Sequence, residues 1–258
     1  MINIIITGAR GRMGRAVTSA AASFGEVFRV CAGVDINESL GDIIEAFPVY
    51  TSLRDFSGEA DVIIDFSHHT AVEGILSYAV EHRMAAVIAT TGHNEDEMKL
   101  IKEASQRIPV FFSRNMSIGV NLLIELCRHA AAALDGFDIE IIEKHHNKKL
   151  DAPSGTAYMI ADALSESLAD KYTAEYVFSR NEKRAERKRE EIGIHAVRGG
   201  TIVGEHEVIF AGRDENVTIS HSAASREVFA QGAIRAAAFV YGKPAGLYSM
   251  NDIIGRLL

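Results

Sequence analysis

Residues 2–14 read INIIITGARGRMG, an apolar β-branched run that leads directly into a glycine-rich turn. The run Ile2–Thr7 predicts a short buried strand. The glycines at positions 8, 11 and 14 permit a tight turn and a close approach of the backbone to a pyrophosphate. A helix expected over Arg12–Ser23 would present its N-terminal N–H groups to the same anion. The stretch therefore predicts a phosphate-binding strand–turn–helix unit, with a purely structural glycine turn as the alternative.

A carboxylate further along the chain supports the binding interpretation. Asp35 follows the second expected strand, Phe28–Val34, and lies 21 residues beyond Gly14. An acid about 20 residues past such a glycine motif binds ribose hydroxyls in dinucleotide-binding proteins. Strand, turn, helix and acid together favour dinucleotide binding over a structural turn.

The rest of the N-terminal half alternates strands with helices. We expect strands at 61–65, 85–89 and 110–112 and helices at 70–82 and 94–107. This order predicts βαβ units and a parallel sheet, as in a Rossmann domain. Polar residues follow three of these strands, namely Phe66-Ser67, Thr90-Thr91-Gly92 and Asn115. They are expected at the carboxyl edge of the sheet, where such folds bind ligands.

The pattern changes after Asn115. A long helix is expected at 118–134, a strand at 138–143, a polar loop at 145–153 and a helix at 154–169 with Ser154 as its N-cap. Three strands then follow without intervening helices, at 192–197, 205–211 and 216–221, before an Ala-rich helix at 225–241. The fold class is therefore α/β, an N-terminal Rossmann domain joined to an α+β domain with a mixed sheet.

Composition excludes several classes of protein. The 258 residues are 47% hydrophobic and carry a net charge of −8, which argues against a nucleic-acid partner. The N-terminus lacks a signal-peptide pattern, and no apolar stretch is long enough to span a membrane. The two cysteines, Cys31 and Cys127, form no disulfide framework, so we expect a cytoplasmic protein. We interpret the charged run 181–191 as a solvated mobile loop rather than a binding tail.

The densest chemistry lies at 143–156, EKHHNKKLDAPSGT. Two histidines and three lysines occupy six consecutive positions of an acidic protein, a concentration that attracts carboxylates. A metal site at His145-His146 is disfavoured, because adjacent residues on an extended chain point to opposite sides. A solvated basic loop and a general acid with a carboxylate clamp both remain open. A histidine or lysine can donate the proton that a hydride acceptor needs.

This segment resembles the E-x-H-H-x-x-K-x-D-A-P-S-G-T signature of the dihydrodipicolinate reductase family. Further matches occur in the family's order along essentially the whole chain, at Gly8–Gly14, Ile64–Ser67, Thr90–Gly92, Asn115–Asn121, Arg198–Gly200, Val203–His206 and Ser225-Arg226. The resemblance implies reduction of a cyclic imine-type dicarboxylate by NAD(P)H, in lysine and diaminopimelate biosynthesis. It also implies a homotetramer.

The resemblance assigns roles to individual residues. His145 corresponds to the proton donor or acceptor and Lys149 to the proton donor. Substrate carboxylates would be bound by His146, Lys149, Ser154, Gly155 and Thr156. Dinucleotide contacts would come from Gly8, Ala9, Arg10, Gly11, Arg12, Met13, Asp35, Ala89, Thr90, Thr91, Ser113, Arg114, Asn115 and Met116. The implied domains are 1–116 with 225–258 for the dinucleotide, and 117–224 for substrate binding and tetramer formation.

Three positions depart from the family pattern. Ala89 replaces a frequent glycine, which changes little because both are small. Arg114 stands where a small residue is common, and either touches the cofactor or faces solvent. The loop 181–191 lacks the usual glycines, so more helix is expected there.

The sequence also bears on the choice of cofactor. A carboxylate at Asp35 suits the two ribose hydroxyls of NADH and repels the 2′-phosphate of NADPH unless a cation compensates. The residues after it are Ile36, Asn37, Glu38 and Ser39, none of them basic. Arg10 and Arg12 remain possible phosphate ligands. We therefore expect NADH to be preferred and NADPH to be used less well.

Two other functions compete with the reductase. A different Rossmann oxidoreductase, such as an amino-acid or aldehyde dehydrogenase, would not require the segment 143–156. A nucleotide-sensing regulator would keep Gly8–Gly14 but have no use for His145 or Lys149. It would also usually carry a DNA-binding module, which the sequence does not contain.

Overall fold

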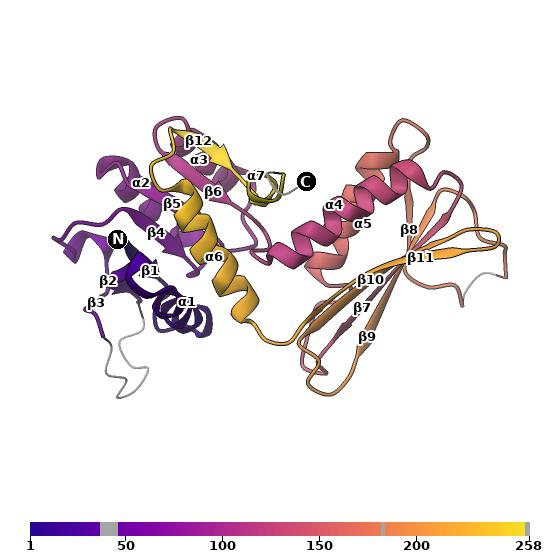
Figure 1. The fold of residues 1–258 in the computed structure, drawn as a ribbon, viewed down its shortest axis with the longest axis horizontal. Helices are drawn as coiled ribbons and strands as arrows, with labels where there is room; N and C mark the ends of the chain where they lie inside the picture. Colours follow the sequence, from indigo (N-terminus) through magenta and orange to yellow (C-terminus); the bar gives the residue numbers. More distant parts are fainter. Residues whose placement is uncertain (37–45, 182–183, 256–258) are drawn as a thin grey trace. The chain divides into compact units, whose positions relative to one another are not determined.

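The computed structural model describes residues 1–36, 46–181 and 184–255. The chain forms two compact units, Met1–Ile118 with Arg226–Leu258, and Gly119–Ser225 (Figure 1). The first unit thus takes in both ends of the chain.

The first unit contains a seven-stranded sheet in the order β12-β6-β5-β4-β1-β2-β3, and every adjacent pair is parallel. Its strands are β1 (Ile2–Thr7), β2 (Phe28–Val34), β3 (Val49–Tyr50), β4 (Val62–Asp65), β5 (Ala85–Ile88), β6 (Pro109–Phe112) and β12 (Gly246–Tyr248). The five predicted strands are confirmed to within one residue. The other two, β3 and β12, were missed because runs of two and three residues show no periodicity.

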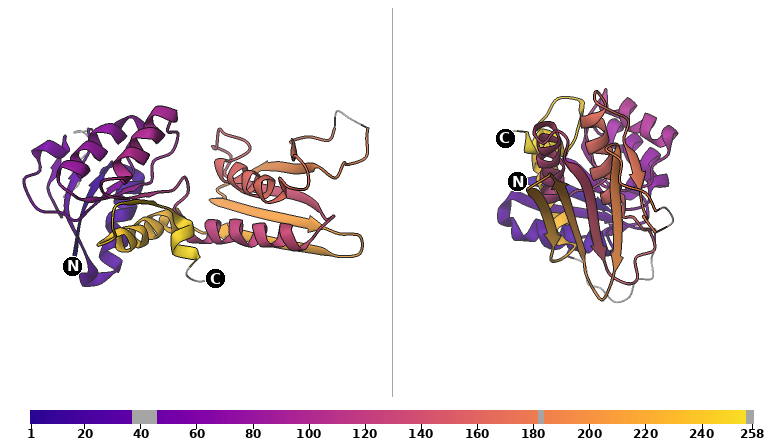
Figure 2. Two further views of the ribbon diagram at one scale, coloured as in Figure 1. Left: turned by 90° about the horizontal axis from the view of Figure 1, so that it is seen from above. Right: turned by 90° about the vertical axis from the view of Figure 1, so that its right-hand side faces the viewer.

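Helices cover both faces of this sheet (Figures 1 and 2). One layer contains α1 (Arg12–Ser23) and α6 (Glu227–Val240), and the other contains α2 (Val72–Glu81) and α3 (Glu95–Ser105). Because both faces are covered, the central strands are continuous apolar runs, and Ile4, Ile5 and Ile6 are fully buried. The single helix predicted at 70–82 instead begins with a short 3₁₀ turn, His69–Ala71, capped by the His68 side chain.

A glycine brings the C-terminal helix close to the end of the first half of the chain. A side-chain carbon on Gly232 of α6 would lie 1.7 Å from the carbonyl oxygen of Met116. Only glycine permits this approach. The short helix α7 (Met250–Ile254) follows β12 and starts with a capping box between Ser249 and Asp252.

The second unit contains a five-stranded sheet in the order β11-β10-β7-β9-β8. The sheet is mixed, as predicted, but the sequence predicted only four of its strands and missed β8. Its strands are β7 (Asp138–His145), β8 (Glu175–Val177), β9 (Glu191–Arg198), β10 (Gly204–Ala211) and β11 (Asn216–Ala223). The strands β7, β10 and β11 pair antiparallel, whereas β7, β9 and β8 pair parallel. Two helices, α4 (Ile118–Ala133) and α5 (Gly155–Leu168), pack on the sheet around Ile141, Leu164 and Phe210.

The predicted end of the strand before the polar loop was wrong by two residues. Strand β7 continues through His145, which is in register with Arg198 of β9. The side chains of Glu143 and His145 face the buried side of the sheet, like Ile139 and Ile141 before them. Polar residues on a buried face hide the strand pattern from a hydrophobicity argument.

The interpretation of 181–191 as a solvated loop holds for most of its described residues, which are exposed, but not for Arg187. Arg187 contacts Asp138 and Glu140 of β7 at 2.7 and 3.1 Å, and only 17% of its side chain is exposed. Within the described residues 184–190 there is no helix, so the expected gain of helix is not found either. Through Arg187 the charged run therefore binds β7, the central strand of the sheet.

In the described residues, no helix is long and apolar enough to cross a membrane. Those same residues contain no group of three or more histidine, cysteine, aspartate or glutamate side chains placed to hold a metal ion.

Candidate active site

Glycines shape the turn between β1 and α1. Gly8 has a φ of 72°, and a side-chain carbon there would lie 2.6 Å from the carbonyl oxygen of Phe66. A side-chain carbon on Gly14 would lie 2.2 Å from the carbonyl oxygen of Gly8. Helix α1 begins after Gly11, which has no side chain to cap it. No side chain therefore caps its first turn, whose N–H groups suit an anion.

The carboxylate predicted to bind ribose lies beside this turn. Asp35 follows β2 and is buried, and one of its oxygens accepts a hydrogen bond of 2.9 Å from the backbone N–H of Arg10. The N–H groups of Gly8 and Ala9 both donate to the carbonyl oxygen of Val34. The phosphate turn and the end of β2 are thus held together as one rigid structure.

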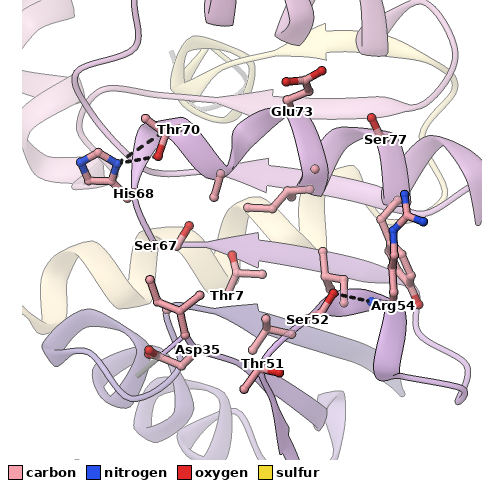
Figure 3. Close-up of a pocket in the computed structure, with 18 of the residues that line it drawn as sticks. Thr7, Asp35, Thr51, Ser52, Arg54, Ser67, His68, Thr70, Glu73 and Ser77 are labelled. Atoms are coloured by element: carbon pink, nitrogen blue, oxygen red, sulfur yellow. Dashed lines mark hydrogen bonds between the residues drawn. The ribbon is translucent and has the colours of Figure 1, made fainter. Parts of the chain in front are cut away.

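A cavity of about 870 Å³ opens beside these residues (Figure 3). Gly8, Gly11 and Asp35 line it, together with Thr51–Arg54 and residues of the β4–α2 connection. A glycine turn, a carboxylate and a cavity of this size fit the adenosine end of a dinucleotide. The sequence argument missed the part of the wall formed by the 3₁₀ turn Leu53–Asp55. This turn follows β3, a strand too short to predict.

The remaining predicted cofactor residues lie at the carboxyl ends of β5 and β6. Buried positions are occupied by Ala89, Thr90, Ser113, Asn115 and Met116. Thr91 and Arg114 are exposed. In the phosphate turn, Ala9 is buried, Arg10 and Met13 are half-buried and Arg12 is exposed.

Glu143 organises the site in the second unit. Its carboxylate is fully buried and binds His145 Nδ1 at 2.6 Å. Arg198 donates two hydrogen bonds to it, of 2.8 and 2.7 Å, and the backbone N–H of Ser154 donates a third, of 3.0 Å. Burial opposes ionisation, but the hydrogen bonds from Arg198 and His145 hold the pKa of Glu143 below its usual value.

This contact also fixes the orientation of the His145 ring. An ionised carboxylate only accepts hydrogen bonds, so Nδ1 carries the hydrogen and Nε2 is left for proton exchange. Burial lowers the pKa of His145, and the Glu143 carboxylate only partly opposes that shift. His145 is therefore neutral near pH 7, with Nε2 as a proton acceptor.

The turn before α5 is connected to His145 through a second histidine. Ser154 caps the helix by accepting from the Ala157 N–H at 3.2 Å, and its hydroxyl lies 3.1 Å from His206 Nε2. The His206 and His145 rings meet edge to face with centroids 5.3 Å apart. His145 and the turn before α5, which includes Gly155 and Thr156, thus belong to one packed cluster.

Lys149 and His146 lie in the loop between β7 and α5. Lys149 forms an ion pair of 2.9 Å with Asp151, and the Asp151 carbonyl accepts from Arg198 at 2.7 Å. His146 is half-buried, and its carbonyl accepts from the Lys149 N–H at 3.2 Å. Arg198 therefore holds both the strand and the loop of the site.

Sequence reasoning missed the contributions of Glu143, Arg198 and His206. Glu143 was quoted in the segment but given no role, and Arg198 lies 55 residues from it. The available signal was alternation, which places Glu143 on the buried face of its strand. A carboxylate there requires a partner.

We expect His206 to make the protein sensitive to acid. Burial lowers the pKa of His206 to about 4, whereas an unfolded histidine titrates near 6.5. Because folding lowers the pKa of His206, the neutral ring lowers no stability above pH 6.5. As the pH falls from 6.5 to about 4, protonation of His206 in the unfolded state lowers the free energy of unfolding by about 3 kcal/mol. The free energy of unfolding should therefore fall less steeply over this range in His206→Gln than in the wild type. Parallel curves would show that another group is responsible.

A Rossmann unit with this phosphate turn and a second unit with this histidine–lysine site define a pyridine-nucleotide-dependent oxidoreductase. Residues 2–116 match the model of the dihydrodipicolinate reductase N-terminus, and residues 119–254 match that of the C-terminus. The chain belongs to the dihydrodipicolinate reductase family, and it is an NAD(P)H-dependent reductase.

Relatives agree with this assignment over their full length. The chain is 55% identical to the 4-hydroxy-tetrahydrodipicolinate reductase of Caldanaerobacter subterraneus subsp. tengcongensis, over 99% of each chain. It is 44% identical to that of Clostridium tetani, over 98% of this chain and 97% of the relative. The dipicolinate-bound dihydrodipicolinate reductase from Paenisporosarcina sp. TG-14 superposes with a TM-score of 0.80 at 26% identity, over 98% and 99% of the two chains.

Proposed function

We propose that this chain reduces 4-hydroxy-tetrahydrodipicolinate to tetrahydrodipicolinate, with His145 and Lys149 handling the proton and the Ser154–Thr156 turn holding the dicarboxylate. The reaction consumes one hydride and one proton and releases one water, and it belongs to lysine and diaminopimelate biosynthesis. The bound NAD(P)H supplies the hydride. The observation that carries this proposal is the Glu143 network, which joins the proton-transfer residue to the anion-binding turn.

The two basic side chains have different tasks. Lys149 carries an ammonium group with three donors, so it both attracts a substrate carboxylate and supplies the proton. His145, neutral and fixed by Glu143, presents Nε2 for proton exchange. His146 and the N–H groups of Gly155 and Thr156 complete the carboxylate clamp. No metal takes part in this assignment.

A planar dicarboxylate tests the clamp. The relative from Paenisporosarcina is named as binding dipicolinate, and pyridine-2,6-dicarboxylate should compete with substrate here. Thr156→Val removes one hydroxyl and should weaken this inhibition by about 1–3 kcal/mol, the cost of leaving a buried polar partner unpaired. The inhibition constant is the measurement, and Thr173→Val, away from the turn, is the control. Equal inhibition of Thr156→Val and wild type would place the anion site elsewhere.

We propose that NADH is preferred over NADPH. Asp35 is buried at the edge of the cavity, and a 2′-phosphate there would meet its charge. The next residue, Ile36, is 85% exposed and also lines the cavity. Asn37, Glu38 and Ser39, which entered the sequence argument, lie outside the described residues. Arg10 and Arg12 remain the alternative phosphate ligands.

Ile36→Arg should therefore shift the preference toward NADPH by adding a cation beside the acid. The measurement is kcat/KM for NADH and for NADPH, in the wild type and in the variant. Ile36→Gln, of similar length but uncharged, is the control and should leave the ratio near that of the wild type. A wild type that clearly prefers NADPH would overturn the hypothesis and point to Arg10 or Arg12.

We further propose that residues 117–224 bind the substrate and assemble a homotetramer in the cytoplasm, whereas residues 1–116 with 225–258 bind the cofactor. The sheet of the second unit supports assembly, because Val197 on β9 is 44% exposed and Ile142 and Ile209 are only partly buried. Apolar side chains of this kind on a sheet face suit contact with a second copy.

A further inference from the structure

Asp65 is a buried carboxylate at the end of the central strand β4, and it was given no role by the sequence argument. It is fully buried. Three hydroxyls donate to it: Thr7 at 2.6 Å, Ser67 at 2.5 Å and Thr90 at 2.9 Å. The backbone N–H of Ser67 adds a fourth hydrogen bond, of 2.9 Å. One carboxylate thus joins the carboxyl ends of three adjacent strands, β1, β4 and β5.

These hydrogen bonds determine what the hydroxyls offer to a ligand. An ionised carboxylate only accepts, and a hydroxyl has a single hydrogen. Thr7, Ser67 and Thr90 therefore direct their hydrogens toward Asp65 and keep only lone pairs for other partners. The Thr90 oxygen already lies 3.2 Å from His93 Nε2.

Thr7 and Ser67 also line the cavity beside the phosphate turn (Figure 3). This part of its wall consequently accepts hydrogen bonds, whereas the first turn of α1 donates them. An acceptor surface binds ligand hydroxyls and disfavours phosphate oxygens, which have no hydrogen to donate. The two surfaces together distinguish the sugar of a nucleotide from its phosphates.

We infer that Asp65 is a positioning residue for the dinucleotide, which acts by turning three hydroxyls into hydrogen-bond acceptors at the carboxyl edge of the sheet. This inference rests on the proposed use of NAD(P)H. It adds that cofactor affinity depends on a carboxylate that does not itself line the cavity. The competing explanation is that Asp65 only ties the three strands together.

Asp61 provides a matched control for that explanation. It directly precedes β4, at the opposite edge of the same sheet, and accepts a hydrogen bond of 2.7 Å from the backbone N–H of Asn3. It therefore also ties β4 to β1, but at the edge away from the cavity. A purely structural role predicts similar behaviour for the two residues.

The test compares Asp65→Asn with Asp61→Asn. The substitution Asp65→Asn keeps the shape of the side chain, but the new amide nitrogen donates where a carboxylate oxygen accepted, so at least one hydroxyl must reverse. The dissociation constants of NADH and NADPH are measured by fluorescence, and the melting temperature is measured without cofactor. Asp65→Asn should weaken binding of the preferred cofactor roughly tenfold or more, and Asp61→Asn less than about twofold.

Several results would overturn the inference. One is wild-type affinity in Asp65→Asn, and another is an equal loss of affinity in both variants. If Asp65→Asn does not fold, Ser67→Ala decides, because it removes one acceptor and leaves the carboxylate in place. Weaker binding in that variant supports the inference, and unchanged binding overturns it. A wild type that binds neither NADH nor NADPH would instead refute the proposed function.

Discussion

Replacing Lys149 with alanine is expected to lower kcat/KM by roughly 10²–10⁴, the usual contribution of a positioned proton donor. The variant loses both the ammonium that attracts a carboxylate and the proton for the reduced ring. NADH affinity should stay near that of the wild type, because the predicted cofactor residues all belong to the first unit. Steady-state kinetics and a cofactor titration measure the two effects.

The adjacent lysine supplies the control for this prediction. Lys148 is exposed, whereas Lys149 is half-buried and paired with Asp151. Both substitutions remove one positive charge from the same loop, so a general electrostatic attraction would be weakened about equally. Lys148→Ala should retain most of the activity. Near-normal turnover in Lys149→Ala, or an equal loss in the two variants, would remove Lys149 from the mechanism.

Glu143→Ala should lower the free energy of unfolding by about 3–5 kcal/mol, the cost of removing one partner of a buried ion pair. Arg198 would lose both of its hydrogen bonds to the carboxylate, and His145 would lose the contact that orients its ring. Activity should fall even at temperatures where the variant remains folded. Urea unfolding and kinetics at low temperature separate the two consequences.

A surface ion pair on the neighbouring strand is the comparison for Glu143. Glu205 pairs with Lys144 at 3.2 Å, and the two side chains are 39% and 37% exposed. Glu205→Ala should cost less than about 1 kcal/mol. The conservative change Glu143→Gln tests the charge alone, because it keeps the shape and one oxygen that can accept a hydrogen bond from His145 Nδ1. Full activity in Glu143→Gln would mean that an uncharged acceptor is enough to hold the ring of His145.

Local patterns were sufficient to predict most of the fold. The strand Ile2–Thr7 and the helix Arg12–Ser23 were predicted at their observed bounds, because their apolar runs and glycine turn are contiguous in sequence. The strands Val49–Tyr50 and Gly246–Tyr248 form only by pairing with longer neighbours in the sheet. A strand that depends on such pairing carries no periodic signal of its own.

The candidate site was predictable only in part. His145, His146 and Lys149 lie in one short segment, and their residue types favoured proton transfer and anion binding but left a solvated basic loop open. Arg198 and His206 reach the same site through strand register, and no local spacing reveals that. The same holds for Asp65, whose three hydroxyl partners come from two other strand ends and its own connection.

The most direct test is oxidation of NADH by the purified protein, measured as a fall in the ultraviolet absorbance of NADH. The substrate, 4-hydroxy-tetrahydrodipicolinate, is generated in the same cuvette by the enzyme that condenses its precursors. The absorbance should fall only when the protein, NADH and this substrate are all present, and pyridine-2,6-dicarboxylate should slow the fall. Omission of the condensing enzyme should abolish the signal. Absence of oxidation with either NADH or NADPH, under conditions where a relative of the same family is active, would contradict the assignment of this chain as the reductase.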